Sequence, residues 1–296
     1  MPAVSYVVLA LAVFIFTGGF ASARFYMEAG GSPADVVALR YGVSGLLFVP
    51  FVVWAAARLR QQPGWWRAAA IALGGGAPFG IFVFIGVSGA PFTHGGGIVP
   101  AFVMVFGTLA AWYVLGETLN RRRILGILLT LVGLAWLLAP ELGRDDVTWW
   151  GEAAYFAAGL CWAGFTVMLR GFKVGALEGA ALAAVFSLPY LVIYFLVLDP
   201  ALFDVDWRKT LTHGFYQGVM FNMIAVAMYG WALARLGAAG VVAGMPLMPI
   251  YAVGLEWYFF DRTAHSMALP AIAVMASGIV LAAGAGQATS PRQNSE

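Results

Sequence analysis

The chain has 296 residues, of which 62% are hydrophobic and only 10% are charged. A soluble domain carries roughly 25% charged residues, so this chain has too few to cover a water-facing surface, and we predict an integral membrane protein. The net charge of +2 gives no indication of a nucleic-acid partner. The single cysteine, Cys161, excludes an internal disulfide and is interpreted as a packing residue.

Apolar runs long enough to cross a bilayer follow one another along the chain. About 20 apolar residues, at a rise of about 1.5 Å each, cross a hydrocarbon core of about 30 Å. The first run lacks the basic segment of a signal peptide, so we interpret it as a retained helix. We therefore predict an all-α polytopic protein whose ten transmembrane helices span residues 4–27, 34–57, 67–88, 92–116, 121–139, 150–170, 177–198, 211–235, 239–260 and 266–286.

The Lys and Arg residues outside these spans are unevenly distributed. Ten lie in even-numbered turns or in the tail, and five lie in odd-numbered turns. Because Lys and Arg concentrate on the cytoplasmic side of a membrane, both termini are predicted to be cytoplasmic in a protein of the inner (plasma) membrane. The polar tail, 287–296, is expected to be a disordered cytoplasmic segment.

The chain also repeats itself. A shift of 145 residues superposes Trp112-Tyr113 on Trp257-Tyr258, among other matches along the whole half. The repeat predicts two five-helix halves, 1–145 and 146–286. Because five is odd, the second half enters the membrane inverted. Transporters use such inverted repeats to alternate access around a site at the repeat interface.

The stretch from Gly95 to Pro140 carries a family resemblance. A glycine-rich entry and Pro100 are followed by Gly116-Glu117-Thr118-Leu119, a turn with three arginines, and a helix containing Gly126 and Gly133. This pattern resembles the EamA-type members of the drug/metabolite transporter (DMT) superfamily, and the likeness covers almost the whole chain. It implies the DMT fold and a transporter rather than an enzyme. Within the family, the chain most resembles the YddG branch, which exports aromatic amino acids.

Proline and glycine interrupt several of the predicted spans. Proline removes a backbone donor and kinks a helix. In lipid, the freed carbonyl needs another partner or a wet cavity. We interpret four prolines as kinks of gating helices, while close helix packing through small residues remains the alternative. The four are Pro78, Pro100, Pro246 and Pro249.

Aromatic, methionine and small polar residues mark the predicted central cavity. Methionine suits promiscuous surfaces, and aromatic rings stack on aromatic substrates. Any one of these residues alternatively faces lipid or packs, and Asn222 alternatively links two helices. The 145-residue shift pairs Trp162 with Thr17 in the middle of their helices. The candidates are Phe16, Thr17, Phe20, Phe79, Phe82, Trp162, Met220, Asn222, Tyr229, Met245 and Met248.

Charge inside the spans is scarce, and Arg40 and Glu256 are the notable cases. Intramembrane charges are functional candidates by default, but both are placed near outer helix ends, which favours snorkelling or mutual pairing. Neither the first nor the sixth helix carries a deep carboxylate. We therefore expect export without a dedicated proton carrier, and the alternative is a proton-coupled multidrug antiporter of the same fold that uses Glu256.

An enzyme is a remote alternative. The two segments Gly42-Val43-Ser44-Gly45 and Gly86-Val87-Ser88-Gly89 fit the serine motif of intramembrane proteases, but Ser44 is predicted to lie far from any histidine that would take its proton. No Walker loop, H-E-x-x-H or cysteine–histidine metal spacing is present. The expected protein is thus a monomeric exporter of small amphipathic metabolites, without cofactor or metal, whose partners are its substrate and the lipid bilayer.

Overall fold

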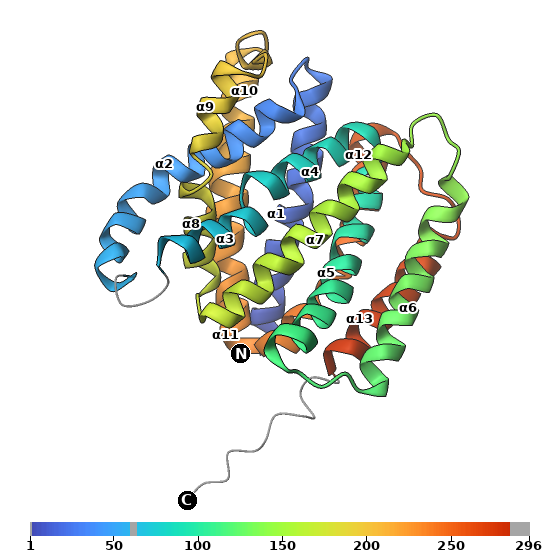
Figure 1. The fold of residues 1–296 in the computed structure, drawn as a ribbon. Coiled ribbons are helices and arrows are strands. Elements are labelled where there is room, and N and C mark those ends of the chain that lie inside the picture. The colour runs from blue at the N-terminus through green and yellow to red at the C-terminus, as the bar shows by residue number, and fades with distance from the viewer. Residues whose placement is uncertain (1, 60–63, 285–296) are drawn as a thin grey trace, which may run out of the picture.

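A bundle of packed helices forms the protein. The computed structural model describes residues 2–59 and 64–284, and every regular element in those ranges is a helix (Figure 1). Nine spans in these ranges are long and apolar enough to cross a membrane, and a shorter apolar helix, Ala268–Gly284, follows them. This arrangement confirms the all-α polytopic prediction. The predicted tail lies outside the described residues.

The first half of the chain runs from the N-terminal helix to a short 3₁₀ turn. Its elements are α1 (Pro2–Glu28), α2 (Pro33–Leu59), α3 (Trp65–Gly75), α4 (Ala77–Gly89), α5 (Phe92–Leu115), α6 (Arg121–Leu138) and η1 (Ala139–Glu141). The second half begins with a long helix and ends beside the first half. Its elements are α7 (Trp149–Phe172), α8 (Ala176–Val185), α9 (Pro189–Leu196), η2 (Ala201–Phe203), α10 (Trp207–Gly214), η3 (Phe215–Ala225), α11 (Val226–Val242), α12 (Leu247–Phe260) and α13 (Ala268–Gly284).

The third span is not the continuous helix predicted over 67–88. It breaks at Gly76 (φ −96°, ψ −146°), which separates α3 from α4. An added Cβ at Gly76 would collide with the Ser187 hydroxyl, and that hydroxyl accepts a hydrogen bond from the Ala77 N–H at 2.8 Å. Pro78 stands in the first turn of α4, where its missing donor costs nothing. A residue from the other half therefore caps the break.

The seventh and eighth spans also depart from the predicted continuous helices. The span predicted over 177–198 is divided between α8 and α9, and Pro189 opens α9. The eighth begins at Trp207 rather than at 211, because the Asp206 carboxylate caps it by accepting from the Arg208 N–H at 2.9 Å. It then passes through a π-helix, η3, before it continues as α11.

The ninth predicted span, 239–260, agrees with the apolar span over Gly240–Phe260, but a turn divides it. The chain leaves helical geometry at Gly237 (φ 70°, ψ 172°), and only residues 239–242 of the expected first turns are helical. The positive φ at Gly237 is accessible to glycine at little cost. A turn then leads to Pro246, which caps α12. Pro249 lies buried in the first turn of α12, so it does not interrupt a formed helix.

Helices α6 and α13 form an antiparallel pair at one side of the bundle (Figure 1). An added Cβ at Gly126 would lie 2.6 Å from the Gly278 carbonyl oxygen, and one at Gly278 would lie 2.5 Å from the Thr130 nitrogen. Glycine thus lets the two backbones touch, as small residues do in membrane bundles. The glycines at 126 and 133 that carry the family resemblance have this packing role.

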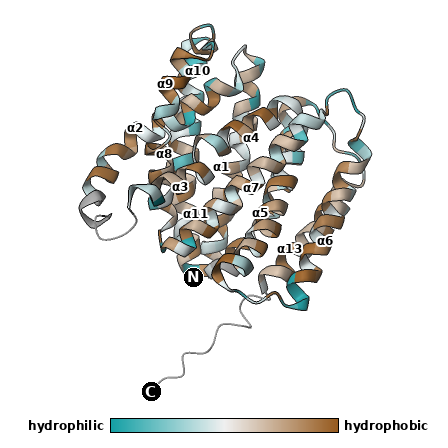
Figure 2. Ribbon diagram, in the orientation of Figure 1, coloured by the Kyte–Doolittle hydropathy of each residue, from teal (hydrophilic) through white to brown (hydrophobic). Residues whose placement is uncertain are grey.

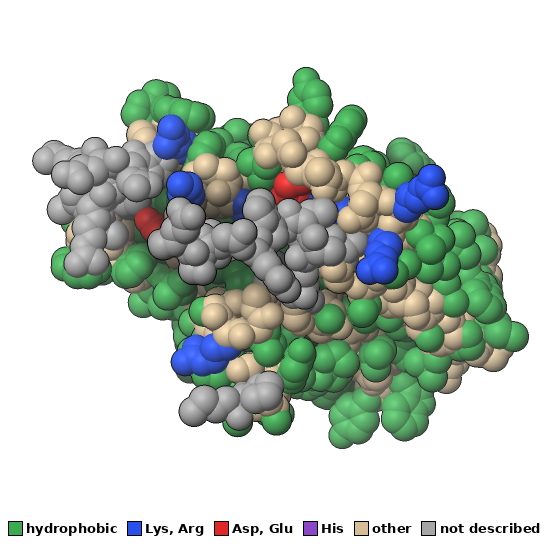
Figure 3. All heavy atoms as spheres, turned by 90° about the horizontal axis from the view of Figure 1, so that it is seen from below, with side chains coloured by type: hydrophobic (Ala, Val, Ile, Leu, Met, Phe, Trp, Pro, Cys, Tyr) green, Lys and Arg blue, Asp and Glu red, His purple; other side chains and the backbone are tan. Residues whose placement is uncertain are grey.

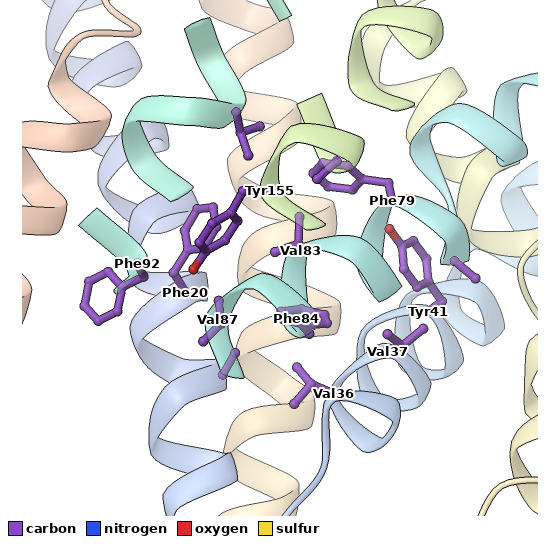
Figure 4. Packing of buried hydrophobic residues seen from close by; sticks show 14 of the residues in the cluster. Phe20, Val36, Val37, Tyr41, Phe79, Val83, Phe84, Val87, Phe92 and Tyr155 are labelled. Carbon is purple, nitrogen blue, oxygen red and sulfur yellow. The ribbon is translucent and has the colours of Figure 1, made fainter. Parts of the chain in front are cut away.

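The largest core lies between α1, α2, α4, α5 and α7. Figure 4 shows part of it, including the rings of Phe20 and Tyr155, which pack edge to face with 6.4 Å between centroids. The outward faces are also apolar, because many large hydrophobic side chains are exposed. Hydrophobic residues are spread along most of the helices (Figure 2). A surface of this kind suits lipid.

The two ends of the bundle differ in charge. The α5–α6 turn and the described end of α13 lie at the same end as the start of α1 (Figure 1). Seen from that end, Lys and Arg side chains stand out on the surface (Figure 3). Arg121, Arg122, Arg170, Lys173 and Arg235 are the exposed cations of these turns and helix ends. We call it the terminal end, and its placement in the cytoplasm stays a prediction.

Candidate substrate site

Arg40, in the second turn of α2, is buried inside the bundle and is 1% exposed. Its Nε and Nη2 atoms donate to the same Oε1 atom of Gln217, at 3.0 and 2.6 Å. Its guanidinium carbon also lies 3.8 Å from the ring centroid of Phe221 and 4.6 Å from that of Phe84. Both rings present faces that attract a cation. A charged group is therefore held deep in the bundle by neutral partners.

This position corrects the interpretation of Arg40 as a shallow, snorkelling side chain. Its guanidinium does not reach the surface, and in the described part of the chain no salt bridge joins it to Glu256 or to any other carboxylate. The prediction for Arg40 was wrong because closeness to a helix end in the sequence does not show whether other elements cover that end. Several other elements cover that end of α2.

Arg40 and its neighbour Tyr41 connect two stretches of irregular backbone. The Tyr41 hydroxyl donates to the Gly75 carbonyl at 3.1 Å, directly before the break between α3 and α4. Arg40 binds Gln217 within the π-helix η3, and the Gln217 amide donates to the Gly19 carbonyl of α1 at 2.7 Å. π-Helical segments occur frequently at functional sites. One turn of α2 thus contacts irregular elements from both halves.

Asn222 acts as a link between helices in this structure. Its Nδ2 donates to the Ser44 hydroxyl at 2.9 Å, and that hydroxyl donates to the Arg40 carbonyl at 2.6 Å. Of the two readings of Asn222, the contact favours interhelical hydrogen bonding. Ser88 likewise donates to a backbone carbonyl, that of Ile85, at 2.8 Å. Neither motif serine has a histidine partner in the described residues.

The predicted cavity side chains fall into two groups. In the first, which joins α1 to η3, α11 and α12, the ring of Phe16 lies 5.0 Å from that of Phe221 and 6.2 Å from that of Tyr229. Met248 packs against this group, and Met245 packs with Tyr229 in the adjoining cluster. Phe221 was not among the predicted residues, although it follows the predicted Met220 directly.

The second group joins α4 to α7. The Trp162 ring, half-buried, lies 4.7 Å from Phe79 and 4.9 Å from Phe165. Phe82 is packed against the same core, whereas Phe20 contacts Tyr155. Thr17, the repeat partner of Trp162, is fully buried and donates its hydroxyl to the Val13 carbonyl at 2.8 Å. Whether any of these residues contacts substrate stays a prediction.

Polar side chains from both halves form a network at the end of the bundle opposite the terminal end. His94, at the start of α5, has its Nδ1 2.5 Å from Glu152 Oε1 of α7 and its Nε2 3.5 Å from Glu141 Oε2 of η1. Arg262, after α12, contacts Glu141 at 2.5 Å and also Asp146. Acidic groups outnumber basic ones in this network, which we call the distal network.

Glu256 of α12 belongs to the same network. Its carboxylate accepts from the Thr93 hydroxyl and, at 3.3 Å, from the Thr93 N–H, and it lies 3.8 Å from Arg262 Nε. The sequence predicts Glu256 near an outer helix end, but it does not indicate that Glu256 lies in one network with His94. The bonded residues are 58 and 163 positions apart in the chain, and a single sequence carries no signal for such pairs.

A smaller ion cluster closes the terminal end. Glu117, after α5, contacts Arg170 of α7 and lies 3.0 Å from Arg123 Nη1 of α6. Partial burial raises the pKa of the Glu117 carboxyl, but the two arginines outweigh burial, so the net pKa is below its usual value. Glu117 thus pairs with an arginine of the turn that follows it in the sequence. The structure adds a contact to the second half that the sequence did not indicate.

Comparison with known proteins fits this architecture. The model of the EamA-like transporter family matches the chain twice, over residues 3–139 and 149–284. A solved structure described as "Crystal structure of protein" is 18% identical, with a TM-score of 0.63, over 95% of this chain and 98% of its own. That identity supports a shared fold alone. No curated protein matches the chain.

An all-helical bundle in which one transporter model matches each half defines a multi-pass membrane transporter. The two matches together span most of the sequence, and the chain belongs to the EamA-like transporter family.

Proposed function

We propose that this transporter exports small amphipathic metabolites, and that aromatic amino acids are its main substrates. One observation supports the location of the substrate site. The third helix of each half is irregular, and the 145-residue shift places the break at Gly76 opposite Phe221 in η3. Interrupted helices at corresponding positions of two repeats are the best indicator of a transporter's binding site.

The side chains around these two stretches support an aromatic substrate. Phe16, Phe221, Tyr229 and Met248 form an apolar group at η3, and Phe79 with Trp162 forms another beside α4. Aromatic rings prefer offset or edge-to-face contact with other rings. Such walls bind phenylalanine, tyrosine or tryptophan better than small aliphatic amino acids.

Alternating access needs two ends that open in turn. The distal network and the Glu117 cluster each include residues of both halves, one at each end of the bundle. In the proposed cycle, one of these clusters separates while the other holds. Rocking of one repeat against the other around a fixed site is the usual mechanism of inverted-repeat transporters.

The test is transport by the purified full-length protein in liposomes loaded with a panel of amino acids, with and without a proton gradient. We expect phenylalanine, tyrosine and tryptophan to leave the vesicles much faster than alanine, at similar rates in both conditions. Equal rates for all amino acids, matching protein-free vesicles, would overturn the substrate assignment.

A second candidate is a proton-coupled multidrug antiporter of the same fold. The excess of carboxylates in the distal network favours it. Glu141, Glu256 and Asp146 all contact Arg262. His94 also contacts Glu141 and Glu152, and Arg144 contacts Asp146, so the four carboxylates of the network face three basic groups. In that case, efflux depends on the proton gradient and hydrophobic cations are transported as well. The same liposome experiment distinguishes the two functions.

A further inference from the structure

The guanidinium of Arg40 lacks a counter-charge. It contacts one amide oxygen, of Gln217, and two aromatic rings, of Phe84 and Phe221. The nearest acidic residue along α2, Asp35, is already bound by the Tyr194 hydroxyl and the Ser32 N–H. A buried charge without an opposite partner is costly. Within a membrane span such a residue is expected to have a functional role.

The partners of Arg40 are arranged as a site for an anion. Two N–H donors of the guanidinium point at a single oxygen, Gln217 Oε1, at 3.0 and 2.6 Å. A carboxylate offers two oxygens in the geometry of the guanidinium fork and forms stronger, charge-assisted hydrogen bonds. A carboxylate that replaces the Gln217 oxygen therefore improves both the charge balance and the hydrogen bonding of Arg40.

The apolar side chains next to Arg40 indicate the part of the ligand beyond its carboxylate. Phe221 lies 3.8 Å from the Arg40 guanidinium, and its ring also contacts Phe16 at 5.0 Å between centroids. Phe221 thus connects the guanidinium of Arg40 to the apolar cluster of Phe16, Tyr229 and Met248. A ligand with a carboxylate at one end and a ring at the other matches this sequence of contacts. A single arginine suits one negative charge better than a phosphate dianion.

The backbone around Arg40 also provides a way to open the site. Gln217 and Phe221 both belong to η3, so a shift of this π-helix moves two of the groups that cover Arg40. Gly19 of α1 lies against both, since an added Cβ there would be 2.6 Å from the Phe221 ring and 3.4 Å from Arg40 Nη2. Because Gly19 has no side chain, the backbone of α1 lies directly against Arg40 and Phe221.

From these contacts we infer that Arg40 binds the carboxylate of the transported molecule, and that Gln217 occupies its place when no substrate is bound. This inference rests on the proposed function, because it names the chemical group that the transporter recognises. The ligand class is an aromatic or otherwise apolar monocarboxylate. Gln217 is a positioning residue that holds the empty site closed.

Two variants test the inference in opposite ways. Arg40→Met removes the charge at similar length. Gln217→Glu keeps the shape and supplies a permanent carboxylate to Arg40, which excludes the carboxylate of a ligand. It loses the hydrogen bond that the Gln217 amide donates to the Gly19 carbonyl, so thermal unfolding without ligand first checks that the variant is folded. Arg208→Met, which changes an exposed cation of α10, is the matched control.

The primary measurement is ligand-induced protection against thermal unfolding of the full-length protein, which does not require transport. Phenylalanine and 3-phenylpropionate carry a carboxylate, and their amides do not. Inorganic phosphate tests charge without a ring. In the wild type and in Arg208→Met, we expect the acids to bind about ten- to a hundredfold more tightly than the amides, the range for charge-assisted hydrogen bonds. Phosphate is expected to give no protection.

In both Arg40→Met and Gln217→Glu, acids and amides are expected to bind alike. Persistence of the acid preference in Gln217→Glu, or its absence in the wild type, would overturn the inference. If Arg40→Met does not fold, Gln217→Glu alone decides. Protection by phosphate equal to that by phenylalanine would refute the ligand class. Transport of phenylalanine with equal competition from its amide would refute the role of Arg40 and leave the proposed function standing.

Discussion

The carboxylate of Glu256 holds the first turn of α5 by accepting from both the N–H and the hydroxyl of Thr93. The two residues lie in different halves of the chain, so this contact joins the repeats at the distal end. Glu256 also lies 3.8 Å from Arg262 Nε. Its burial therefore has a structural explanation that does not require it to carry a transported proton.

Substitution of Glu256 by glutamine tests this explanation. The amide oxygen still accepts from Thr93, while the charge beside Arg262 is lost. We expect transport of an aromatic amino acid to persist in Glu256→Gln and to show the pH dependence of the wild type. The measurement is uptake into proteoliposomes over a range of pH. Complete loss of transport in a variant that is folded and inserted would favour the proton-coupled antiporter.

Trp162 provides a test of the aromatic wall. Its ring packs against Phe79 and Phe165 and remains half-buried, and a stacked ring contributes roughly 0.5–1.5 kcal/mol beyond area burial. Together with about 25 cal/mol for each Å² of lost apolar contact, Trp162→Ala should weaken aromatic ligands about tenfold or more.

The Trp162 measurement is competition by phenylalanine, tryptophan and alanine against a transported aromatic amino acid. Small aliphatic ligands should change much less than the aromatic ones. Trp149→Ala, at a position that is 81% exposed, serves as the control and should leave both classes unchanged. An equal loss for both classes in Trp162→Ala would identify this residue as a packing residue.

The Glu117 cluster predicts a pH-dependent contribution to stability. Because the pKa of Glu117 is lowered in the folded protein, the contribution is present above the unfolded-state pKa, about 4.3 for a glutamate, and is lost as the pH falls through the folded-state pKa. Since Arg170 is largely exposed, the effect is small. Glu117→Gln should reduce stability at pH 7 by about 0.5 kcal/mol.

Thermal unfolding of Glu117→Gln and of the wild type between pH 7 and strongly acidic pH measures this difference. The stabilities of the two proteins should become equal at pH values below the usual pKa range of a glutamate. Asp204→Asn, at an exposed position with no salt bridge in the described part of the chain, should differ little from the wild type at any pH. A constant difference for Glu117→Gln across the whole range would show that the ion pairs do not stabilise the fold.

The orientation of the bundle is predicted by its cations. Exposed arginines and lysines gather at the terminal end (Figure 3), so this end should face the cytoplasm. A fluorescent protein that folds only in the cytoplasm, fused after Gln287, should fluoresce. An inactive fluorescent fusion together with an active periplasmic reporter at the same site would reverse the predicted orientation.

The length and composition of the apolar runs were sufficient to predict the all-helical membrane fold and approximate spans. This works because a bilayer requires about 20 apolar residues for each crossing, whatever the rest of the chain does. The pattern from Gly95 to Gly133 also carried the family, and the glycines at 126 and 133 have a packing role that their position in the motif does not reveal.

Tertiary contacts decided what local sequence could not. The break at Gly76 depends on Ser187, which lies 110 residues away from the capped Ala77. The depth of Arg40 depends on Gln217, 177 residues away. The start of α2, predicted to lie near the membrane surface, is covered by α1, α4 and η3. Arg40, predicted to snorkel, is therefore the buried charge of the candidate site. Hydropathy reports how apolar a segment is, whereas burial and hydrogen-bond partners depend on which distant segments pack against it.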